Sequence, residues 1–104
     1  MKPYRVEIAQ AAKGDLREIN RYISVELKAP ASALKLADAF ADAFIDLEDM
    51  PQKYPLVRDE RLAAKGYRRR GVKNYSVFYK INENTHEVDV SRILYGRRDW
   101  QNIL

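Results

Sequence analysis

The chain lacks cysteine and has a single histidine, His86. The absence of cysteine excludes disulfides, thiolate metal sites and cysteine nucleophiles. With one histidine and no cysteine, zinc centres and catalytic triads are excluded as well. His86 lies at a predicted hairpin turn, so we expect a turn residue rather than a general base. The sequence therefore predicts neither a metal nor a cofactor.

Glycine and long apolar runs are also scarce. The four glycines are scattered and form no phosphate-binding loop. No apolar run approaches the roughly 18 residues that a membrane span needs. The chain begins in a strand pattern rather than in a signal peptide. We therefore expect a cytoplasmic protein that binds no membrane.

What the chain does have is the composition of a folded domain. It contains 104 residues, of which 46% are hydrophobic and 33% are charged. This balance is typical of soluble globular proteins and argues against disorder. The length favours one domain over residues 1–104, with a core too small to enclose a deep cavity.

Positive charge is concentrated in the second half. Residues 1–50 hold seven Lys/Arg and nine Asp/Glu, a net charge of −2, whereas residues 51–104 hold twelve and six, a net charge of +6. Five cations and no acid lie between Lys65 and Lys73. Such a cluster is either a solvated surface or a surface for a polyanion or an acidic partner. It points to a binding face rather than to a small-molecule substrate pocket.

A strand and two helices are predicted in the first half. Tyr4, Val6 and Ile8 alternate with charged residues, as in a strand with one buried face. A first helical stripe follows, at Leu16, Ile19, Ile23 and Leu27. The second helix begins near Pro30, which suits a first helical turn, and runs to about Met50 before Pro51. Its expected buried stripe is Ala37, Phe40, Phe44 and Leu47. Asp38, Asp42 and Asp46 recur on this helix, and a solvated face is expected there rather than a cation site.

Three strands are predicted in the second half, after a loop over residues 51–65. The strands cover roughly 66–71, 74–81 and 87–95, with a hairpin turn at 82–85. In the middle strand, Tyr75, Val77, Tyr79 and Ile81 share a face. The order β-α-α-β-β-β predicts an α+β fold, in which a helical hairpin packs on one face of a small, mainly antiparallel sheet.

Arg92 and two of the tyrosines are placed by the strand pattern of the second half. Strict alternation puts Arg92 on the face of Val88 and Val90. Three alternatives follow for the Arg92 side chain. A bulge near Ile93 turns it in another direction, it points into a groove on the sheet, or it pairs with Asp89 or Glu87. Tyr79 is expected in the core, and Tyr95 nearer the basic surface.

Two segments resemble the RelE/ParE superfamily of bacterial toxins, the toxic halves of type II toxin–antitoxin pairs. They are Tyr67-Arg68-Arg69-Arg70-Gly71, leading into Asn74-Tyr75-Ser76-Val77-Phe78-Tyr79, and Ile93-Leu94-Tyr95-Gly96-Arg97-Arg98-Asp99. The resemblance covers essentially the whole chain. It implies growth arrest by the toxin and neutralisation by a cognate antitoxin. The residues expected to bind antitoxin or target are Arg68, Arg69, Arg70, Lys73, Arg92, Arg97 and Arg98.

The superfamily has two mechanisms, and the resemblance is closer to the ParE branch, which poisons DNA gyrase. The nuclease branch commonly has an arginine where this chain has Ser76, and the tail after Asp99 has no tyrosine or histidine. The alternative is a RelE-like enzyme that cleaves mRNA on the ribosome without metal, using Arg69, Arg98 and Tyr95. A third alternative is a non-toxic nucleic-acid-binding module.

Overall fold

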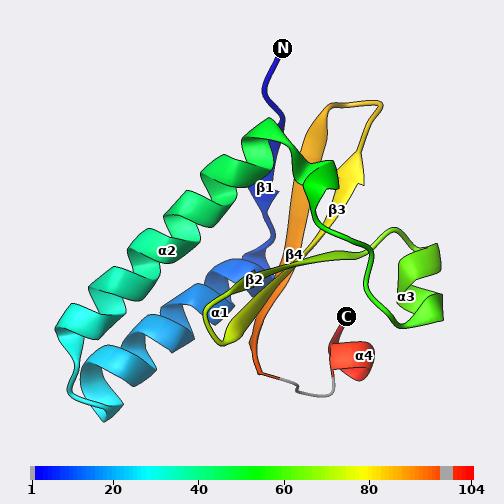
Figure 1. The fold of residues 1–104 in the computed structure, drawn as a ribbon. Helices are drawn as coiled ribbons and strands as arrows, with labels where there is room; N and C mark the ends of the chain where they lie inside the picture. The colour runs from blue at the N-terminus through cyan, green and yellow to red at the C-terminus, as the bar shows by residue number, and fades with distance from the viewer. Residues whose placement is uncertain (1, 97–99) are drawn as a thin grey trace.

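The computed structural model describes residues 2–96 and 100–104. The predicted α+β order is confirmed, with additional short helices (Figure 1). The elements are β1 (Arg5–Ile8), α1 (Gln10–Arg21), the π-helical turn η1 (Tyr22–Glu26), α2 (Pro30–Asp49), the 3-10 turn η2 (Pro51–Lys53), α3 (Glu60–Ala64), β2 (Arg68–Val72), β3 (Tyr75–Asn82), β4 (Glu87–Tyr95) and α4 (Trp100–Ile103).

The four strands form one mixed sheet in the order β1-β4-β3-β2. The meander from β2 to β4 is antiparallel, and β1 pairs in parallel with the first part of β4, from Arg5↔Glu87 to Ile8↔Val90. The expected mainly antiparallel sheet is thus confirmed. Because β1 is short, the outer edge of β4 beyond Val90 pairs with no strand in the part of the chain that the structure describes.

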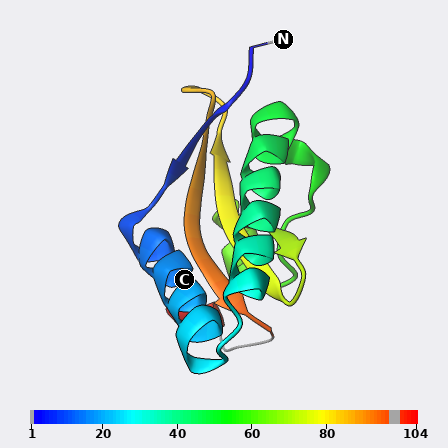
Figure 2. The same ribbon diagram turned by 90° about the vertical axis from the view of Figure 1, so that its left-hand side faces the viewer.

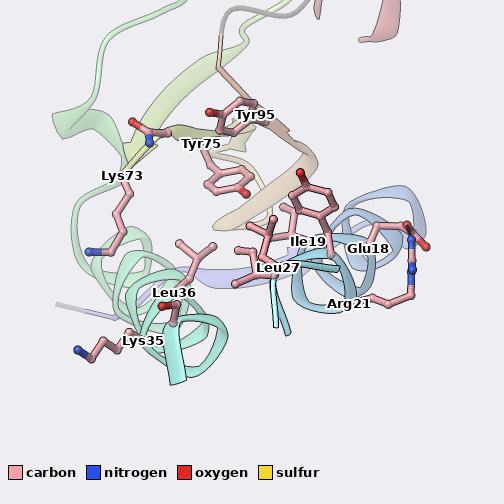
Figure 3. Close-up of a pocket in the computed structure, with 13 residues that line it drawn as sticks. Glu18, Ile19, Arg21, Leu27, Lys35, Leu36, Lys73, Tyr75 and Tyr95 are labelled. Atoms are coloured by element: carbon pink, nitrogen blue, oxygen red, sulfur yellow. Dashed lines mark hydrogen bonds and ion pairs between the residues drawn. The ribbon is translucent and has the colours of Figure 1, made fainter. Parts of the chain in front are cut away.

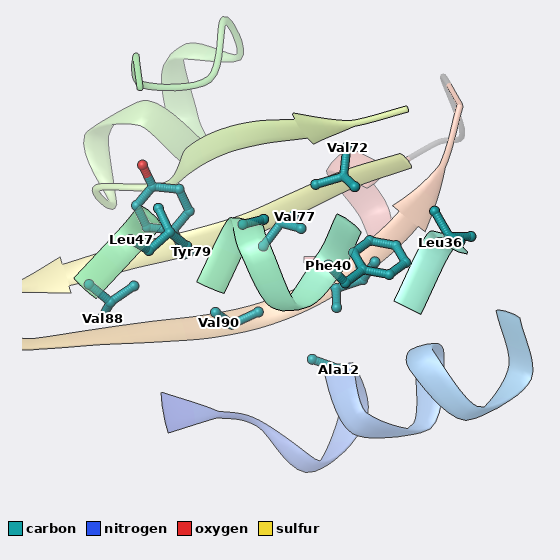
Figure 4. Packing of buried hydrophobic residues seen from close by; sticks show 11 residues of the cluster. Ala12, Leu36, Phe40, Leu47, Val72, Val77, Tyr79, Val88 and Val90 are labelled. Carbon is teal, nitrogen blue, oxygen red and sulfur yellow. The ribbon is translucent and has the colours of Figure 1, made fainter. Parts of the chain in front are cut away.

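The helices lie on both faces of the sheet. The hairpin of α1 and α2 covers one face, and the short α3 and α4 lie on the other (Figures 1 and 2). The larger core lies under the hairpin and includes Phe40, Leu47, Val77, Tyr79 and Val90 (Figure 4). The expected shared face of β3 is confirmed, since Tyr75 and Ile81 also pack there. A second, smaller cluster on the opposite face consists of Val57, Leu62, Phe78 and Leu94.

Helix α2 has the predicted ends and most of the predicted buried stripe. Pro30 occupies its first turn, and Met50 ends it before Pro51. Phe40 and Leu47 are buried as expected, and the half-buried Phe44 packs against the core. Ala37 is exposed, so that part of the prediction is wrong. The stripe also includes Ala33, Leu36 and Ala43, which follow the same spacing of three and four residues.

Helix α1 changes its winding after Arg21, within the predicted helical stripe. Over Tyr22–Glu26 the chain is π-helical, and the Leu27 amide bonds the Tyr22 carbonyl five residues back at 2.9 Å. The extra residue per turn rotates later side chains away from the core stripe. Leu27, which we expected to be buried, is therefore 55% exposed, whereas Leu16, Ile19 and Ile23 pack on the core as predicted.

Residues 51–65, expected as a loop, contain helical structure. The η2 turn begins at Pro51, and α3 begins after Asp59, whose side chain accepts a hydrogen bond from the Leu62 amide at 3.0 Å. Leu62 is buried in the second cluster, so α3 covers the face of the sheet opposite the α1–α2 hairpin. A five-residue helix is too short to give a periodic sequence signal.

Within the described residues, no helix is long and apolar enough to cross a membrane.

Candidate functional site

Strand alternation divides the three consecutive arginines of β2 between the two faces of the sheet. Arg68 lies on the side of the α1–α2 hairpin, where its Nη1 donates to the Tyr54 carbonyl at 2.5 Å. Arg69 is exposed on the other side, and its Nε donates to Ser76 Oγ at 2.6 Å. The cluster that the sequence suggested as one basic surface is therefore split, because successive strand side chains point to opposite faces.

Arg70 returns to the hairpin side and meets the carboxylate of Asp46. Its Nε lies 3.5 Å from Asp46 Oδ2, and its guanidinium lies 5.2 Å from the centre of the Tyr54 ring. The Tyr54 hydroxyl donates a hydrogen bond to the same carboxylate. Asp38 and Asp42 are exposed as expected, but Asp46 is half-buried in this network rather than solvated. Arg70 thus fastens β2 to the end of α2, and Arg68 fastens it to the segment that follows α2.

Arg92 binds Asp15 of α1, in a pairing that the sequence did not suggest. Its Nε and Nη2 donate to the two carboxylate oxygens, each at 2.8 Å. The strand register slips between the pairs Phe78↔Arg92 and Tyr79↔Val90, so a bulge at Ser91 re-aims Arg92. The bulge that we considered is confirmed, but the partner is neither Asp89 nor Glu87. The hydrogen bond to Asp15 is the main cause that raises the pKa of Arg92.

Tyr95 and Lys73 border an open groove of about 780 Å³ at the free end of the helical hairpin (Figure 3). We call this the tip groove. Its apolar residues come from α1, η1, α2 and the sheet; they are Ile19, Tyr22, Ile23, Leu27, Leu36, Tyr75 and Tyr95. The ring of Tyr75 makes edge contacts with Phe40 in the core and with Tyr95 at the surface. Burial is the main cause that raises the pKa of Tyr75.

The proposed catalytic pair of Arg69 and Tyr95 does not converge in this structure. Arg69 pairs in register with Phe78, on the face of the smaller cluster. Tyr95 pairs with Tyr75, on the face of the hairpin. Their side chains therefore leave opposite faces of the sheet. Arg97 and Arg98 lie outside the described residues.

His86 stabilises the N-terminal strand, as expected of a turn residue. Its ring stacks on Tyr4 with centroids 3.7 Å apart, and its Nε2 lies 2.7 Å from the Lys2 carbonyl oxygen. It is at the opposite end of β4 from Tyr95, roughly 27 Å away for a strand of this length. Among residues 2–96 and 100–104, no cluster of potential ligands is arranged to hold a metal ion.

The tip groove is the feature that sequence reasoning missed. Its exposed apolar residues include Tyr22 and Leu27, and a regular helix would have placed Leu27 differently. No short sequence motif predicts a π-helical turn, so hydrophobic periodicity alone could not locate the groove. The only usable signal was that two tyrosines, Tyr75 and Tyr95, occupy paired strand ends.

Comparisons with known proteins agree with this architecture. The family model described as the ParE toxin of the type II toxin–antitoxin system parDE matches residues 6–100. A structure of the chromosomal ParDE system from P. aeruginosa is similar with a TM-score of 0.72 and 19% identity, covering 90% of this chain and 97% of the other. The toxin–antitoxin complex RelBE2 from Mycobacterium tuberculosis is similar with a TM-score of 0.64 and 22% identity, covering 91% and 93%. Comparison with curated protein sequences gives no significant match.

These matches and the fold confirm the resemblance that the sequence suggested. The family match spans the hairpin, the sheet except for Arg5, and the start of α4. The chain belongs to the ParE toxin family of type II toxin–antitoxin systems, within the RelE/ParE superfamily.

Proposed function

We propose that this toxin arrests bacterial growth by poisoning DNA gyrase and is neutralised by a cognate antitoxin. The observation that carries the proposal is the match of the ParE toxin family over residues 6–100. The matched family is named after ParE, the branch that poisons DNA gyrase. The sequence of the last strand resembles that branch. The geometry of the sheet adds independent support.

The surroundings of Ser76 favour a non-nuclease mechanism. Ser76 stands where the nuclease branch commonly has an arginine, and it is only 2% exposed. Its hydroxyl accepts the hydrogen bond from Arg69 Nε at 2.6 Å. Ser76 thus supplies no positive charge to a phosphodiester. Its hydrogen bond also restrains the neighbouring cation, Arg69. Arg92 is likewise engaged by Asp15.

Proton transfer is also poorly provided for among the described residues. His86 lies at the opposite end of β4 from Tyr95 and contacts the N-terminal segment. Because the pKa of Tyr75 is raised, even less of this residue is ionised at neutral pH than of free tyrosine, so it cannot readily accept a proton. A phosphodiester cleaver without a proton-transfer group forfeits roughly 10²–10⁴ in rate. These features weigh against a nuclease.

The antitoxin part of the proposal draws on the solved relatives. Their titles describe the ParDE toxin–antitoxin system and the toxin–antitoxin complex RelBE2. A chain of the same fold and family is expected to bind a partner of the same kind. The antitoxin would be encoded beside the toxin.

The alternative is ribosome-dependent, metal-independent cleavage of mRNA. One observation favours it: the guanidinium of Arg69 is exposed on a sheet face, where it could contact a phosphate. In this mechanism Arg69, Arg98 and Tyr95 would act on the transition state, although Arg69 and Tyr95 lie on opposite faces. A plain nucleic-acid-binding module has no comparable support, because the family consists of toxins.

A gyrase supercoiling assay with purified toxin, freed from its antitoxin, tests the proposal. We expect supercoiling to fall as toxin is added, with cleaved DNA trapped on gyrase. Full gyrase activity at toxin excess would contradict it. In that case, codon-biased cuts in mRNA on translating ribosomes, abolished by Arg69→Ala and Arg98→Ala, would support the nuclease.

A further inference from the structure

Helix α2 carries apolar residues on its solvent side as well as on the side that packs against the sheet. Leu34 is 69% exposed and Ile45 is 62% exposed. They lie about three turns apart on one side of the helix, with the exposed Ala41 between them. Among the described elements, none covers this side of α2 (Figures 1 and 2). A helix that is apolar on both sides is normally covered on both.

Helix α1, in the same hairpin, has an ordinary polar surface. Its exposed side chains include Lys13, Arg17 and Glu18, whereas its apolar residues Leu16 and Ile19 pack against the core. The outward apolar residues of α2 are therefore a property of that helix and not of the hairpin as a whole. Exposed apolar residues that share one surface, rather than standing singly, mark an interaction site.

Two carboxylates accompany this apolar surface. Asp38 and Asp42 are exposed and one helical turn apart, and within the described part of the chain neither forms an ion pair, even with the nearby Lys35. Like charges at this spacing destabilise a helix. We call this surface the outer face of α2; it consists of Leu34, Asp38, Ala41, Asp42 and Ile45.

The charge of α2 runs against that of the protein as a whole. The helix holds one lysine and five acidic residues, a net charge of −4, in a chain whose net charge is +4. Of the five acids, only Asp46 has a printed cationic partner among the described residues, Arg70. A cationic partner placed on the outer face would therefore relieve a repulsion that the free toxin leaves uncompensated.

The chemistry of the outer face selects among possible occupants. Phosphates of a nucleic acid or of an anionic membrane would be repelled by the carboxylates. A small molecule needs a concave site, but Leu34 and Ile45 line neither the tip groove nor the gap between α1 and α2. A second copy in two-fold contact would bring Asp38 and Asp42 against the same acids. A protein surface with cations around an apolar patch fits.

We propose that the outer face of α2 docks on a cationic, partly apolar protein surface of gyrase. This inference rests on the proposed function, which supplies gyrase as the target. An enzyme that binds DNA presents lysines and arginines to the phosphates, so cationic protein surface lies beside its DNA. Leu34 and Ile45 would be buried in the contact, and Asp38 and Asp42 would pair with the cations. Target binding is thereby assigned to an acidic helix instead of the basic strands.

Reversing one charge of the outer face provides the first test. Asp42→Lys converts a repulsive pair with Asp38 into an attractive one, so Tm should rise or stay unchanged. The toxin concentration that half-inhibits supercoiling should nevertheless rise by about tenfold, and inhibition should become less sensitive to salt. Glu60→Lys is the control, because it makes the same charge change at an exposed residue of α3. It should inhibit gyrase within about twofold of the wild type.

Truncating the apolar residues of the outer face supplies the second test. Leu34→Ala combined with Ile45→Ala should weaken gyrase inhibition by about tenfold or more, because the apolar centre of the contact is lost. The control, Val25→Ala with Leu56→Ala, truncates two residues that are 61% and 46% exposed outside α2. It should leave inhibition within about twofold of the wild type. Circular dichroism confirms that each variant is folded.

The outcomes separate the outer face from the proposed function. Binding of full-length antitoxin, expressed from the reading frame beside the toxin gene, is measured on the same variants and should not change. Wild-type inhibition by both outer-face variants would overturn the docking face and leave gyrase poisoning intact. Weaker antitoxin binding in these variants would also overturn it, because the face would then belong to the antitoxin. Absence of gyrase inhibition by the wild-type toxin would instead contradict the proposed function.

Discussion

The carboxylate of Asp15 in α1 accepts three hydrogen bonds from β4. The donors are Nε and Nη2 of Arg92, each at 2.8 Å, and the Ile93 amide at 2.9 Å. The amide belongs to the outer edge of β4 beyond the end of β1, where no strand among the described residues pairs with it. A buried amide without a partner is costly. Asp15 therefore replaces a strand at this edge, and its charge is matched by Arg92.

Replacing Asp15 should lower stability more than breaking an exposed ion pair does. Asp15→Ala leaves the Ile93 amide and the Arg92 guanidinium without their partner, so we expect a loss of about 2–4 kcal/mol in the free energy of unfolding. Glu18→Ala removes an exposed partner of Arg21 and should cost less than about 1 kcal/mol. Urea unfolding of both variants measures the difference, and equal losses would contradict this role of Asp15.

Two leucines of α2 test which stripe of the helix is buried. Leu36 is 6% exposed in the main core, and Leu34 is 69% exposed on the same turn. Leu36→Ala should cost about 2–5 kcal/mol because it opens a cavity, whereas Leu34→Ala should change stability by less than about 0.5 kcal/mol. Thermal unfolding of the pair checks the result. A large loss at Leu34 alone would mean that the helix presents its other face to the sheet.

Tyr79 should make the fold sensitive to alkaline pH. Burial raises the pKa of its hydroxyl above the value near 10 of free tyrosine, and the hydroxyl donates to the Pro51 carbonyl at 2.6 Å. Because the folded state holds this proton more tightly, the stabilisation is complete below pH 10. It is lost as pH rises from 10 towards the raised pKa. Tyr79→Phe should be less stable at pH 7 by about 1–2 kcal/mol and should lose less stability above pH 10. Parallel losses in both proteins would exclude Tyr79 as the cause.

The neighbouring arginines Arg69 and Arg70 should respond differently to charge reversal. Arg70→Glu places a second carboxylate beside Asp46, so we expect a loss of about 1–3 kcal/mol and a lower Tm. Arg69→Glu changes an exposed side chain on the opposite face and removes its hydrogen bond to Ser76, so Tm should fall by less than in Arg70→Glu. Differential scanning calorimetry of the two variants, identical in charge change, makes the comparison. A lower Tm for Arg69→Glu than for Arg70→Glu would contradict the assigned faces.

The sequence by itself determined the order of elements and the shared face of β3. Alternation over Tyr75–Ile81 and the prolines at 30 and 51 are local signals, and each acts within a few residues of the structure that it specifies. The family resemblance was likewise present in contiguous segments, and the family match confirms it. Local physical rules were sufficient for these features.

Only the tertiary structure decided the partners of the charged residues and the location of the groove. Asp15 and Arg92 are 77 positions apart, and no periodicity relates them. The bulge at Ser91 changes which face Arg92 joins, and the π-helical turn changes which residues of η1 reach solvent. The bulge shifts the strand alternation by one residue, and the π-helical turn shifts the helical repeat by one residue. The energy that stabilises these two irregularities comes from contacts between elements. The basic cluster was visible in the sequence, and alternation along β2 divides it between two faces; the tertiary structure decided which of these faces α2 covers.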